Sequence, residues 1–204
     1  MLKELIKQGL INENGEVKEG IILWSADNDT VKIPTKREED SDYDIYANFE
    51  EDYMIIQPQE TKIIPTNLRC AMNKKWRLKL EERGSTGTKA MIQQSGVIDS
   101  GFRGTIGIPI TNGGNKPIII LKGEVPQIIK DLAIVYPYTK AICQAKLDEV
   151  PQIESITIST EELTSIPSER GEGMLGSSNK YNKQNTKERQ INISVFYNIQ
   201  IYNQ

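Results

Sequence analysis

Short apolar runs alternate with clusters of turn-forming residues along most of the chain, which is the pattern of a protein built from β-strands. The runs are rich in Ile, Val, Thr and Tyr, and clusters of Gly, Pro, Asn, Asp or Ser separate them. They are GIILW, TVKI, DYDIYA, YMIIQ, TKIIPT, WRLKLEE, MIQQSGVID, GTIGIPITN, KPIIIL, LAIVYP, KAICQAKL and QIESITIS. Many short strands at regular spacing are typical of a sandwich, a jelly roll or a distorted barrel. We therefore expect an all-β fold.

The two ends of the chain depart from the strand pattern. Apolar residues recur at helical spacing over residues 1–10, and Asn14-Gly15 marks a turn, so we expect a short N-terminal helix followed by a turn. A second short helix is expected around residues 160–164 (TEELT). After Ile166 the sequence becomes polar and glycine-rich, a composition that cannot bury enough apolar surface to order itself.

These patterns divide the chain into four parts. We expect an N-terminal extension over residues 1–30, a β domain over 31–166, a flexible tail over 167–180 and a C-terminal extension over 181–204, whose role stays open. Inside the β domain, the charged loop KREEDS (36–41) is expected to be solvated surface.

Composition narrows the classes of partner. The 204 residues are 37% hydrophobic, which is enough for one well-buried core. The net charge of −3 argues against a protein that binds nucleic acids or membrane surfaces broadly, and no apolar run approaches the ~20 residues that span a bilayer. Cys70 and Cys143 lie in apolar surroundings without a CxxC partner. We expect buried free thiols in a cytoplasmic protein, with a disulfide as the alternative.

The chain contains no histidine. This absence removes Ser-His-Asp and Cys-His nucleophilic machinery, and it removes zinc sites that depend on imidazole. Any chemistry must therefore use carboxylates, hydroxyls, Arg and Lys, or a metal ion held by oxygen ligands.

Four segments framed by glycine or charge could carry such chemistry. They are SDYDIYA (41–47), ERGSTGTK (82–89), GVIDSGFRG (96–104) and RGEGMLGSS (170–178). In the second segment Arg83 could bind phosphate with its planar fork, beside exposed backbone N–H groups. In the third segment Asp99 could act as a general base that polarises water. Taken singly, each segment also fits an ordinary turn, linker or strand edge.

Taken together and in this order, the segments resemble the five motifs of the homotrimeric deoxyuridine triphosphatase (dUTPase) family. The matching stretches are SDYDIYA (41–47), RGSTG (83–87), GVIDSGFRG (96–104), TKAICQ (139–144) and RGEGMLGSS (170–178). The resemblance covers about residues 31–180. It implies a distorted jelly roll, also called a β-clip, assembled as a homotrimer. It also implies hydrolysis of dUTP to dUMP and pyrophosphate with Mg²⁺.

The resemblance also implies roles for individual residues. Asp99 would activate the water that attacks the α-phosphorus, and Asp44 would contact Mg²⁺ through water. The residues expected to bind substrate are Arg83, Gly84, Ser85, Gln93, Val97, Ile98, Phe102, Gln144, Arg170, Leu175, Gly176, Ser177 and Ser178. Each active site would draw on three subunits. The second and fourth motifs would come from one subunit, the third from another and the fifth from the remaining one.

Two other functions share this fold. A deoxycytidine triphosphate deaminase would carry a Glu where this chain has Pro109 and a second Arg where it has Thr88, which argues against that activity. A binding or regulatory protein of the same fold is the second alternative. Its contact with a regulatory protein partner would involve the long segment 113–136 between the third and fourth motifs and the atypical C-terminal tail.

Overall fold

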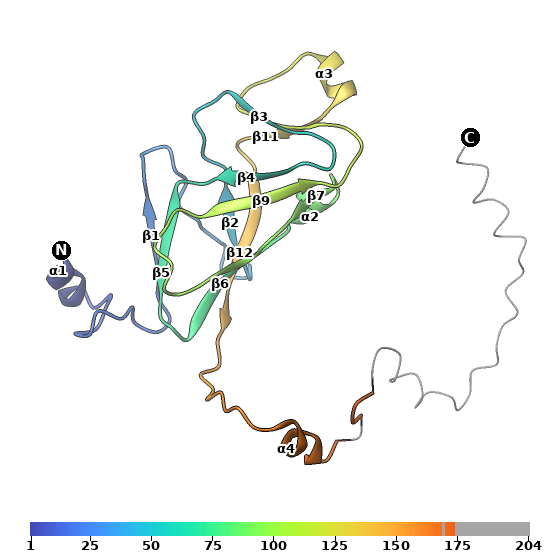
Figure 1. Ribbon diagram of the computed structural model, residues 1–204. Helices are drawn as coiled ribbons and strands as arrows, with labels where there is room; N and C mark the ends of the chain where they lie inside the picture. The colour runs from blue at the N-terminus through green and yellow to red at the C-terminus, as the bar shows by residue number, and fades with distance from the viewer. Residues whose placement is uncertain (169, 174–204) are drawn as a thin grey trace, which may run out of the picture. The chain divides into compact units, whose positions relative to one another are not determined.

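The structure, a computed structural model, describes residues 1–168 and 170–173. The chain forms two compact units, of which the first covers Met1–Ile153 and the second begins at Glu154. The first unit consists mainly of short β-strands, as Figure 1 shows, and this confirms the expected all-β fold. No helix in the described part of the chain has the length and apolar character needed to span a membrane.

Twelve strands and four short helices make up the described residues. The strands are β1 (Ile22–Ala26), β2 (Tyr43–Tyr46), β3 (Tyr53–Ile56), β4 (Thr61–Pro65), β5 (Leu68–Met72), β6 (Trp76–Glu81), β7 (Met91–Gln93), β8 (Val97–Ile98), β9 (Gly107–Asn112), β10 (Ile118–Leu121), β11 (Ile134–Pro137) and β12 (Ala141–Glu149). The helices are α1 (Leu2–Lys7), α2 (Gly84–Gly87), α3 (Gln127–Leu132) and α4 (Thr160–Ser165).

The strands form four small sheets. Their orders are β2-β12-β6-β8, β4-β9-β7, β11-β10-β3 and β1-β5. All pairs are antiparallel except β10 and β11, whose parallel pairing requires the crossover that contains α3. The helix α3 contacts β11, and in Figure 1 it lies at the opposite end of the first unit from α1.

One hydrophobic cluster holds the sheets together, and isoleucine dominates it. Alternate residues of β9 are buried, as expected for strands with one face on a core. Each isoleucine buried in this way contributes about 2–3 kcal/mol. The fully buried residues of this cluster include Ile45, Ile56, Ile64, Leu78, Met91, Ile106, Ile108, Ile110, Ile118, Ile120 and Tyr136.

Local pattern misplaced several elements. The strand β5 was not expected, whereas residues 30–33 and 152–159, expected as strands, pair with no strand among the described residues. The expected run MIQQSGVID divides into β7 and β8, because the chain turns at Ser95, which has a φ of 51°. The helices α1 and α4 lie where helices were predicted.

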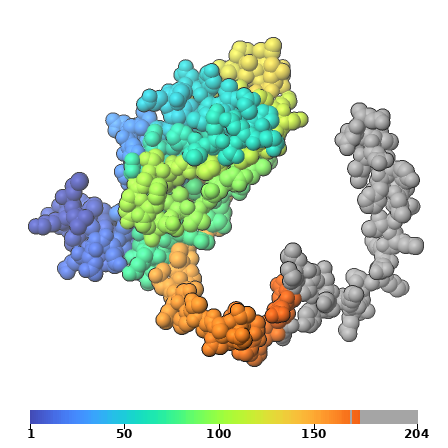
Figure 2. Space-filling view, in the orientation of Figure 1, coloured from blue at the N-terminus to red at the C-terminus, as the bar shows by residue number. Residues whose placement is uncertain are grey.

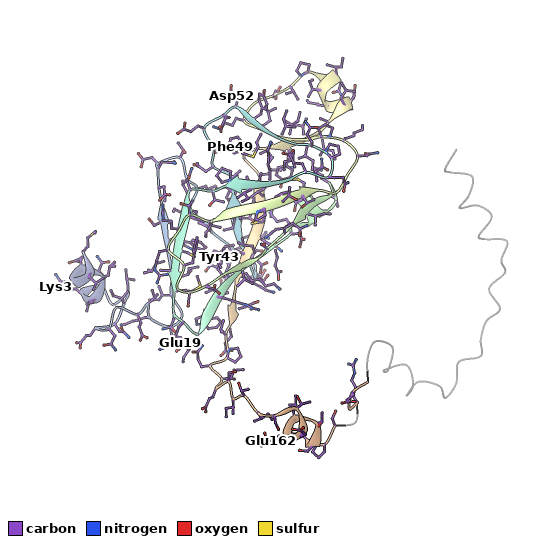
Figure 3. All side chains as sticks on the ribbon, in the orientation of Figure 1. Lys3, Glu19, Tyr43, Phe49, Asp52 and Glu162 are labelled. Carbon is purple, nitrogen blue, oxygen red and sulfur yellow. The ribbon has the colours of Figure 1, made fainter. Side chains whose placement is uncertain are left out.

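The segment 1–30 belongs to the same compact unit as the β domain that follows it. Strand β1 pairs with β5 along its full length, so this segment contributes to the β domain. The preceding turn is also attached to the domain, because Asn73 Nδ2 donates to Val17 O at 2.7 Å and Lys75 forms an ion pair with Glu19 at 2.9 Å. Figure 3 shows Glu19 at this end of the unit, with Phe49 toward the other. The compact unit ends at Ile153 rather than at residue 166.

Both cysteines are free and buried, which confirms the predicted thiols. Burial raises the pKa of the Cys70 thiol to about 11, and burial also raises the pKa of Cys143. Most of the expected tail over 167–180 and all of the extension over 181–204 lie outside the described residues.

Candidate active site

Four of the predicted site residues lie on one face of the sheet β2-β12-β6-β8. In the strand register Gln144 stands between Asp44 of β2 and Glu81 of β6. Arg83 follows Glu81 by two residues in extended backbone, so it shares that face. Continuing the β6–β8 register by one residue places Asp99 opposite Arg77, on the same face. The opposite face of these strands carries buried core residues.

A polar cavity of about 690 Å³ lies at one end of this face. Its lining residues are Thr35, Lys36, Arg37, Glu39, Asp40, Ser41, Asp42, Asp44, Arg83 and Gln144. The structure thus brings together one predicted residue from each of the first, second and fourth motifs, which are Asp44, Arg83 and Gln144.

Arg83 is held in place at this cavity by two partners. Its Nε lies 3.0 Å from Asp44 Oδ1 and its Nη2 donates to Asp44 Oδ2 at 3.3 Å. Its Nη1 donates to Ser85 Oγ at 3.5 Å. A guanidinium has five N–H groups, so two remain for a ligand after these contacts with described residues. The arrangement offers an oriented phosphate-binding fork.

The second motif folds as a single helical turn, α2, rather than as an irregular turn. The hydroxyl of Thr86 closes this turn, because it accepts from Arg83 N at 3.1 Å and donates to Arg83 O at 2.9 Å. The N–H groups of Gly84 and Ser85 open the helix, where no intrahelical acceptor exists. Such N–H groups bind anions. Apart from its chain neighbours and the backbone of α2 itself, no atom of the described residues lies within 4 Å of the place a Cβ would take on Gly84, so its backbone is open to close approach.

Tyr136 supports this turn from β11, and sequence reasoning missed it. Its hydroxyl lies 3.4 Å from Ser85 Oγ and donates to Ala141 O at 2.6 Å. Tyr136 is almost completely buried, at 1% exposure. The hydroxyl of a tyrosine in a buried strand needs a hydrogen-bond partner. This general requirement was the one feature of the sequence that could have indicated a supporting role for Tyr136.

The charged loop 36–41 has a different role from the one expected. It is exposed, but it forms one wall of the cavity instead of plain solvated surface. The loop closes on itself: Arg37 forms an ion pair with Asp40 at 2.8 Å, and Lys36 Nζ donates to Asp40 O at 2.7 Å. The Arg37 guanidinium holds the pKa of Asp40 below its ordinary value, so this carboxylate is ionised at neutral pH.

The third motif forms a tight hairpin on β6. Leu80 N donates to Gly96 O at 2.7 Å, and a Cβ on Gly96 would lie 2.6 Å from Leu80 O, so this close approach requires glycine. At the tip, Phe102 N donates to Asp99 O at 3.0 Å. The ring of Phe102 lies over Gly104, because a Cβ there would come within 2.5 Å of it. Asp99 is exposed.

The hairpin lies apart from the cavity within one chain. Arg83 follows Arg77, the residue opposite Asp99, by six positions, which corresponds to about 20 Å along an extended strand. Val97 is half exposed beside Asp99, whereas Ile98 packs against the core. Gln93 Oε1 is buried and has no hydrogen-bond partner among the described residues. The single chain therefore presents two separate groups of predicted site residues.

The fifth motif is described only at its start. Arg170 Nε donates to Gly173 O at 2.9 Å in the second unit. The other predicted residues of this motif, which are Leu175, Gly176, Ser177 and Ser178, lie outside the described residues.

Comparison with known protein families shows to which family the chain belongs. A family model described as dUTPase matches residues 28–179. The chain belongs to the dUTPase family. Its sequence relatives include the Pol polyprotein of caprine arthritis encephalitis virus (strain Cork), with 33% identity over 92 residues, which is 45% of this chain and 8% of that polyprotein. The Pol polyprotein of equine infectious anemia virus (strain Wyoming) is 29% identical over 115 residues, covering 56% of this chain and 10% of the polyprotein. The chain therefore spans a small part of these curated relatives.

Solved dUTPase structures share the fold. A point mutant of the Staphylococcus bacteriophage 80alpha dUTPase with dUpNHpp has a TM-score of 0.61 and 21% identity, covering 78% of this chain and 98% of that chain. The native EIAV dUTPase has a TM-score of 0.52 and 19% identity, covering 69% and 98%. A point mutant of the dUTPase of S. aureus phage phi11, described with a structural Mg(II) ion, has a TM-score of 0.55 and 17% identity, covering 70% and 99%. These likenesses confirm the jelly-roll type of fold.

Proposed function

We propose that this chain hydrolyses dUTP to dUMP and pyrophosphate. The observation that carries the proposal is the cavity that gathers Asp44, Arg83 and Gln144 from three separate motifs in a chain of the dUTPase family. The cavity is lined mostly by polar and charged side chains and contains an oriented guanidinium, which suits a triphosphate better than an apolar ligand. This function gives each predicted site residue a specific role.

In the proposed reaction Asp99 accepts a proton from water, and the water oxygen attacks the α-phosphorus. The bond from the α-phosphorus to its bridging oxygen breaks, and pyrophosphate leaves with the electron pair. Arg83, together with the N–H groups of Gly84 and Ser85, stabilises the charge on the phosphate oxygens. Gln144 would position the water or a phosphate oxygen from β12. A positioned general base contributes about 10²–10⁴-fold to such a step.

The hairpin that carries Asp99 would also bind the nucleoside. Val97 and Ile98 would present backbone groups to the uracil edge, and Gln93 lies at the base of the same hairpin. Phe102, which is 42% exposed, would pack on the deoxyribose. The ring is folded back over Gly104, which fixes its place at the tip of the hairpin. A ribose 2′-hydroxyl would meet this ring, which disfavours UTP.

The proposed reaction needs more than one copy of the chain. Asp99 must lie beside the α-phosphorus while Arg83 holds the phosphates, and a separation of about 20 Å along β6 does not permit this in one copy. We infer that the enzyme is a homotrimer in which Asp99 of one copy faces Arg83 and Gln144 of another. The fifth motif, beginning at Arg170, would come from the third copy and close over the triphosphate.

The donor set at the cavity fits magnesium that arrives with the substrate. No group of three or more His, Cys, Asp or Glu side chains in the described residues could hold a metal ion by itself. Asp42 and Asp44 line the cavity, and Arg83 already contacts both oxygens of Asp44. Magnesium keeps several waters and takes phosphate oxygens as ligands, so Asp44 would hold Mg²⁺ through water. The bound ion would neutralise charge on the triphosphate.

A pyrophosphate-release assay tests this function directly. The purified chain with Mg²⁺ is offered dUTP, dCTP, dTTP and UTP in parallel, and ammonia release from dCTP is followed as well. We expect pyrophosphate from dUTP at a kcat/KM at least about tenfold above the other three nucleotides, a difference of about 1.4 kcal/mol in transition-state binding. Pyrophosphate release from none of them would contradict the proposal. Ammonia from dCTP would indicate the deaminase instead.

A further inference from the structure

The hairpin that carries Asp99 is tied to the β1–β5 ribbon by an ion pair outside all five motifs. Asp27 directly follows β1, and Arg69 lies in β5. The guanidinium contacts both carboxylate oxygens, with Nε 2.6 Å from Oδ1 and Nη2 3.0 Å from Oδ2. Arg69 Nη1 donates to the backbone carbonyl of Arg103 at 3.0 Å. Thr105 Oγ1 donates to Asp27 Oδ2 at 3.0 Å. The pair therefore binds the segment that follows the tip of the hairpin at two points, Arg103 and Thr105.

Arg103 extends this contact into the tip of the hairpin. Its own Nη1 donates to Ser100 O at 2.6 Å and to Phe102 O at 2.8 Å. The tip is closed by the hydrogen bond from Phe102 N to Asp99 O. Arg69 thus holds the backbone of Arg103, and the side chain of Arg103 in turn holds the carbonyls of Ser100 and Phe102 in the turn that begins at Asp99. Four consecutive contacts connect Asp27 to the catalytic turn.

Few other contacts determine where this turn lies. Strand β8, which leads into it, contains two residues. Among the described residues, the next backbone hydrogen bond that joins this segment to another part of the chain is from Ile106 N to Leu68 O at 2.8 Å. Among the described residues, the hydrogen bonds that join 99–105 to the rest of the chain are those to Arg69 and Asp27. Apart from packing, the position of the turn depends on this pair.

We propose that Asp27 and Arg69 are positioning residues for the reaction, because they fix the hairpin that presents Asp99 and Phe102 to the nucleotide. The inference rests on the proposed dUTP hydrolysis and deepens it. Arg69 contacts a carboxylate through Nε and Nη2 and a carbonyl through Nη1 at once. The planar guanidinium holds these donors in fixed and separate directions, which the compact ammonium group of lysine does not reproduce. Lysine at this position would retain the ion pair but lose the bond to Arg103 O.

Two substitutions with a matched control test the proposal. Arg69→Gln and Lys75→Gln each break an ion pair whose cation is about half exposed, at 41% and 51%, but the pair of Lys75 with Glu19 lies far from the hairpin in sequence. We expect Arg69→Gln to lower kcat/KM for dUTP about tenfold or more, with kcat reduced as well as KM raised. Lys75→Gln should leave both constants as in the wild type. Thermal unfolding should be similar in the two variants.

Arg69→Lys separates positioning from simple stabilisation. If the ion pair served stability alone, lysine would restore wild-type kinetics. The proposed role predicts that Arg69→Lys remains impaired in kcat/KM while it unfolds at the wild-type temperature. Wild-type kinetics in both Arg69→Gln and Arg69→Lys would overturn the proposal and leave the dUTPase assignment intact.

Hydrogen exchange in the nucleotide-free protein provides a readout that does not depend on activity. Amides of residues 99–104 should exchange faster in Arg69→Gln than in the wild type or in Lys75→Gln. Should the wild-type chain fail to hydrolyse dUTP, this measurement still tests the positioning of the turn. Unchanged exchange in Arg69→Gln would overturn the proposal.

Discussion

Arg83 shows at the scale of one residue how packing prepares a binding group. Asp44 contacts its Nε and Nη2, and Ser85 lies within 3.5 Å of Nη1. The guanidinium is therefore oriented before any ligand arrives. An oriented side chain loses less rotamer freedom on binding, so more of the interaction energy contributes to affinity. Affinity for the triphosphate should depend on Asp44 as well as on Arg83.

Asp99→Asn removes the proposed base while keeping the size of the side chain. The carboxylate of Asp99 makes no hydrogen bond or ion pair with another described residue, so folding should be unaffected. We expect kcat for dUTP to fall by about 10²–10⁴-fold, with binding of a non-hydrolysable dUTP analogue retained. Pyrophosphate release and calorimetry measure the two quantities. Asp52→Asn, an exposed control outside the cavity and the hairpin, should stay active, and wild-type turnover in Asp99→Asn would contradict the assignment.

Gly104→Ala tests the position of the Phe102 ring. A methyl group at residue 104 would come within 2.5 Å of the far end of this ring, which must then rotate away. Because a flexible ring can move cheaply, stability should change little, while KM for dUTP should rise several-fold. Gly101→Ala in the same hairpin is the control, since no atom of the described residues lies within 4 Å of its added methyl group. Equal KM values for the two variants would argue against a role for the ring.

The cysteine thiols should be protected by burial. The raised pKa of Cys70, about 11, means that roughly one thiol in a thousand is ionised at pH 8. Alkylation of the folded protein by iodoacetamide should therefore be slow at pH 8. It should accelerate about tenfold per pH unit until the thiol titrates, because the thiolate is the nucleophile. Mass spectrometry of timed samples, with urea-unfolded protein as the reference, checks this; labelling of native protein at the unfolded rate would contradict it.

Among the elements, the short helix α2 is held both by a side chain of its own and by a neighbouring strand. Four residues are too few for a stable isolated helix. The hydroxyl of Thr86 closes the turn internally, and Ser85 lies beside Tyr136 of β11. The second motif is thus attached to the segment that leads into the fourth motif. This contact links two segments that we propose bind phosphate.

Tyr136→Phe tests this connection. The substitution leaves the carbonyl of Ala141 without the hydroxyl that lies 2.6 Å from it, in a buried site. We expect a loss of about 1–3 kcal/mol in unfolding free energy, and a higher KM for dUTP because Ser85 loses a neighbour. Denaturant unfolding and steady-state kinetics measure the two effects. Tyr53→Phe, on a residue that is 55% exposed, should change neither, and an unchanged unfolding free energy in Tyr136→Phe would exclude the supporting role.

Sequence pattern located elements better than it located their ends and partners. Runs such as IVYP and KPIIIL became β11 and β10, because β-branched residues with flanking turn signals favour strands locally. The run QIESITIS has the same composition but pairs with no described strand. Strand β5 was missed, although it pairs with the whole of β1. The composition of a segment sets its preference for extended backbone, whereas a β-strand also needs a second strand with which it can form hydrogen bonds.

At the scale of the whole molecule, two incomplete groups of site residues lie on one sheet face. In each copy the Asp99 hairpin and the Arg83 cavity are separated, so one copy can supply its hairpin to the next and receive one from the third. Such a head-to-tail contact closes into a ring when its rotation is three-fold. The outer face of β4-β9-β7, seen in Figure 2 toward the viewer, exposes Ile63 and Ile92 and is a candidate contact surface for this ring.

Ile63→Lys tests this surface. Ile63 is 66% exposed in the single chain, and a lysine there would have to bury its charge if another copy covers it. We expect the trimer to dissociate at concentrations about tenfold or more above those of the wild type, with activity lost in parallel. Analytical ultracentrifugation measures the assembly. Ile128→Lys on α3, with 65% exposure, is the matched control, and an intact trimer in Ile63→Lys would exclude this face.

Sequence analysis was sufficient to predict the β-rich class, the buried thiols, the short helices α1 and α4 and the segments where chemistry could lie. Those features depend on local periodicity, turn residues and residue types, all of which can be read from residues that are close together in the sequence. Only the folded chain shows that Asp44, Arg83 and Gln144 share a cavity, that loop 36–41 forms a wall of that cavity and that Arg69 contacts the Asp99 hairpin. These contacts depend on which strands pair and in which register, and residues far apart in the chain carry no local signal of either.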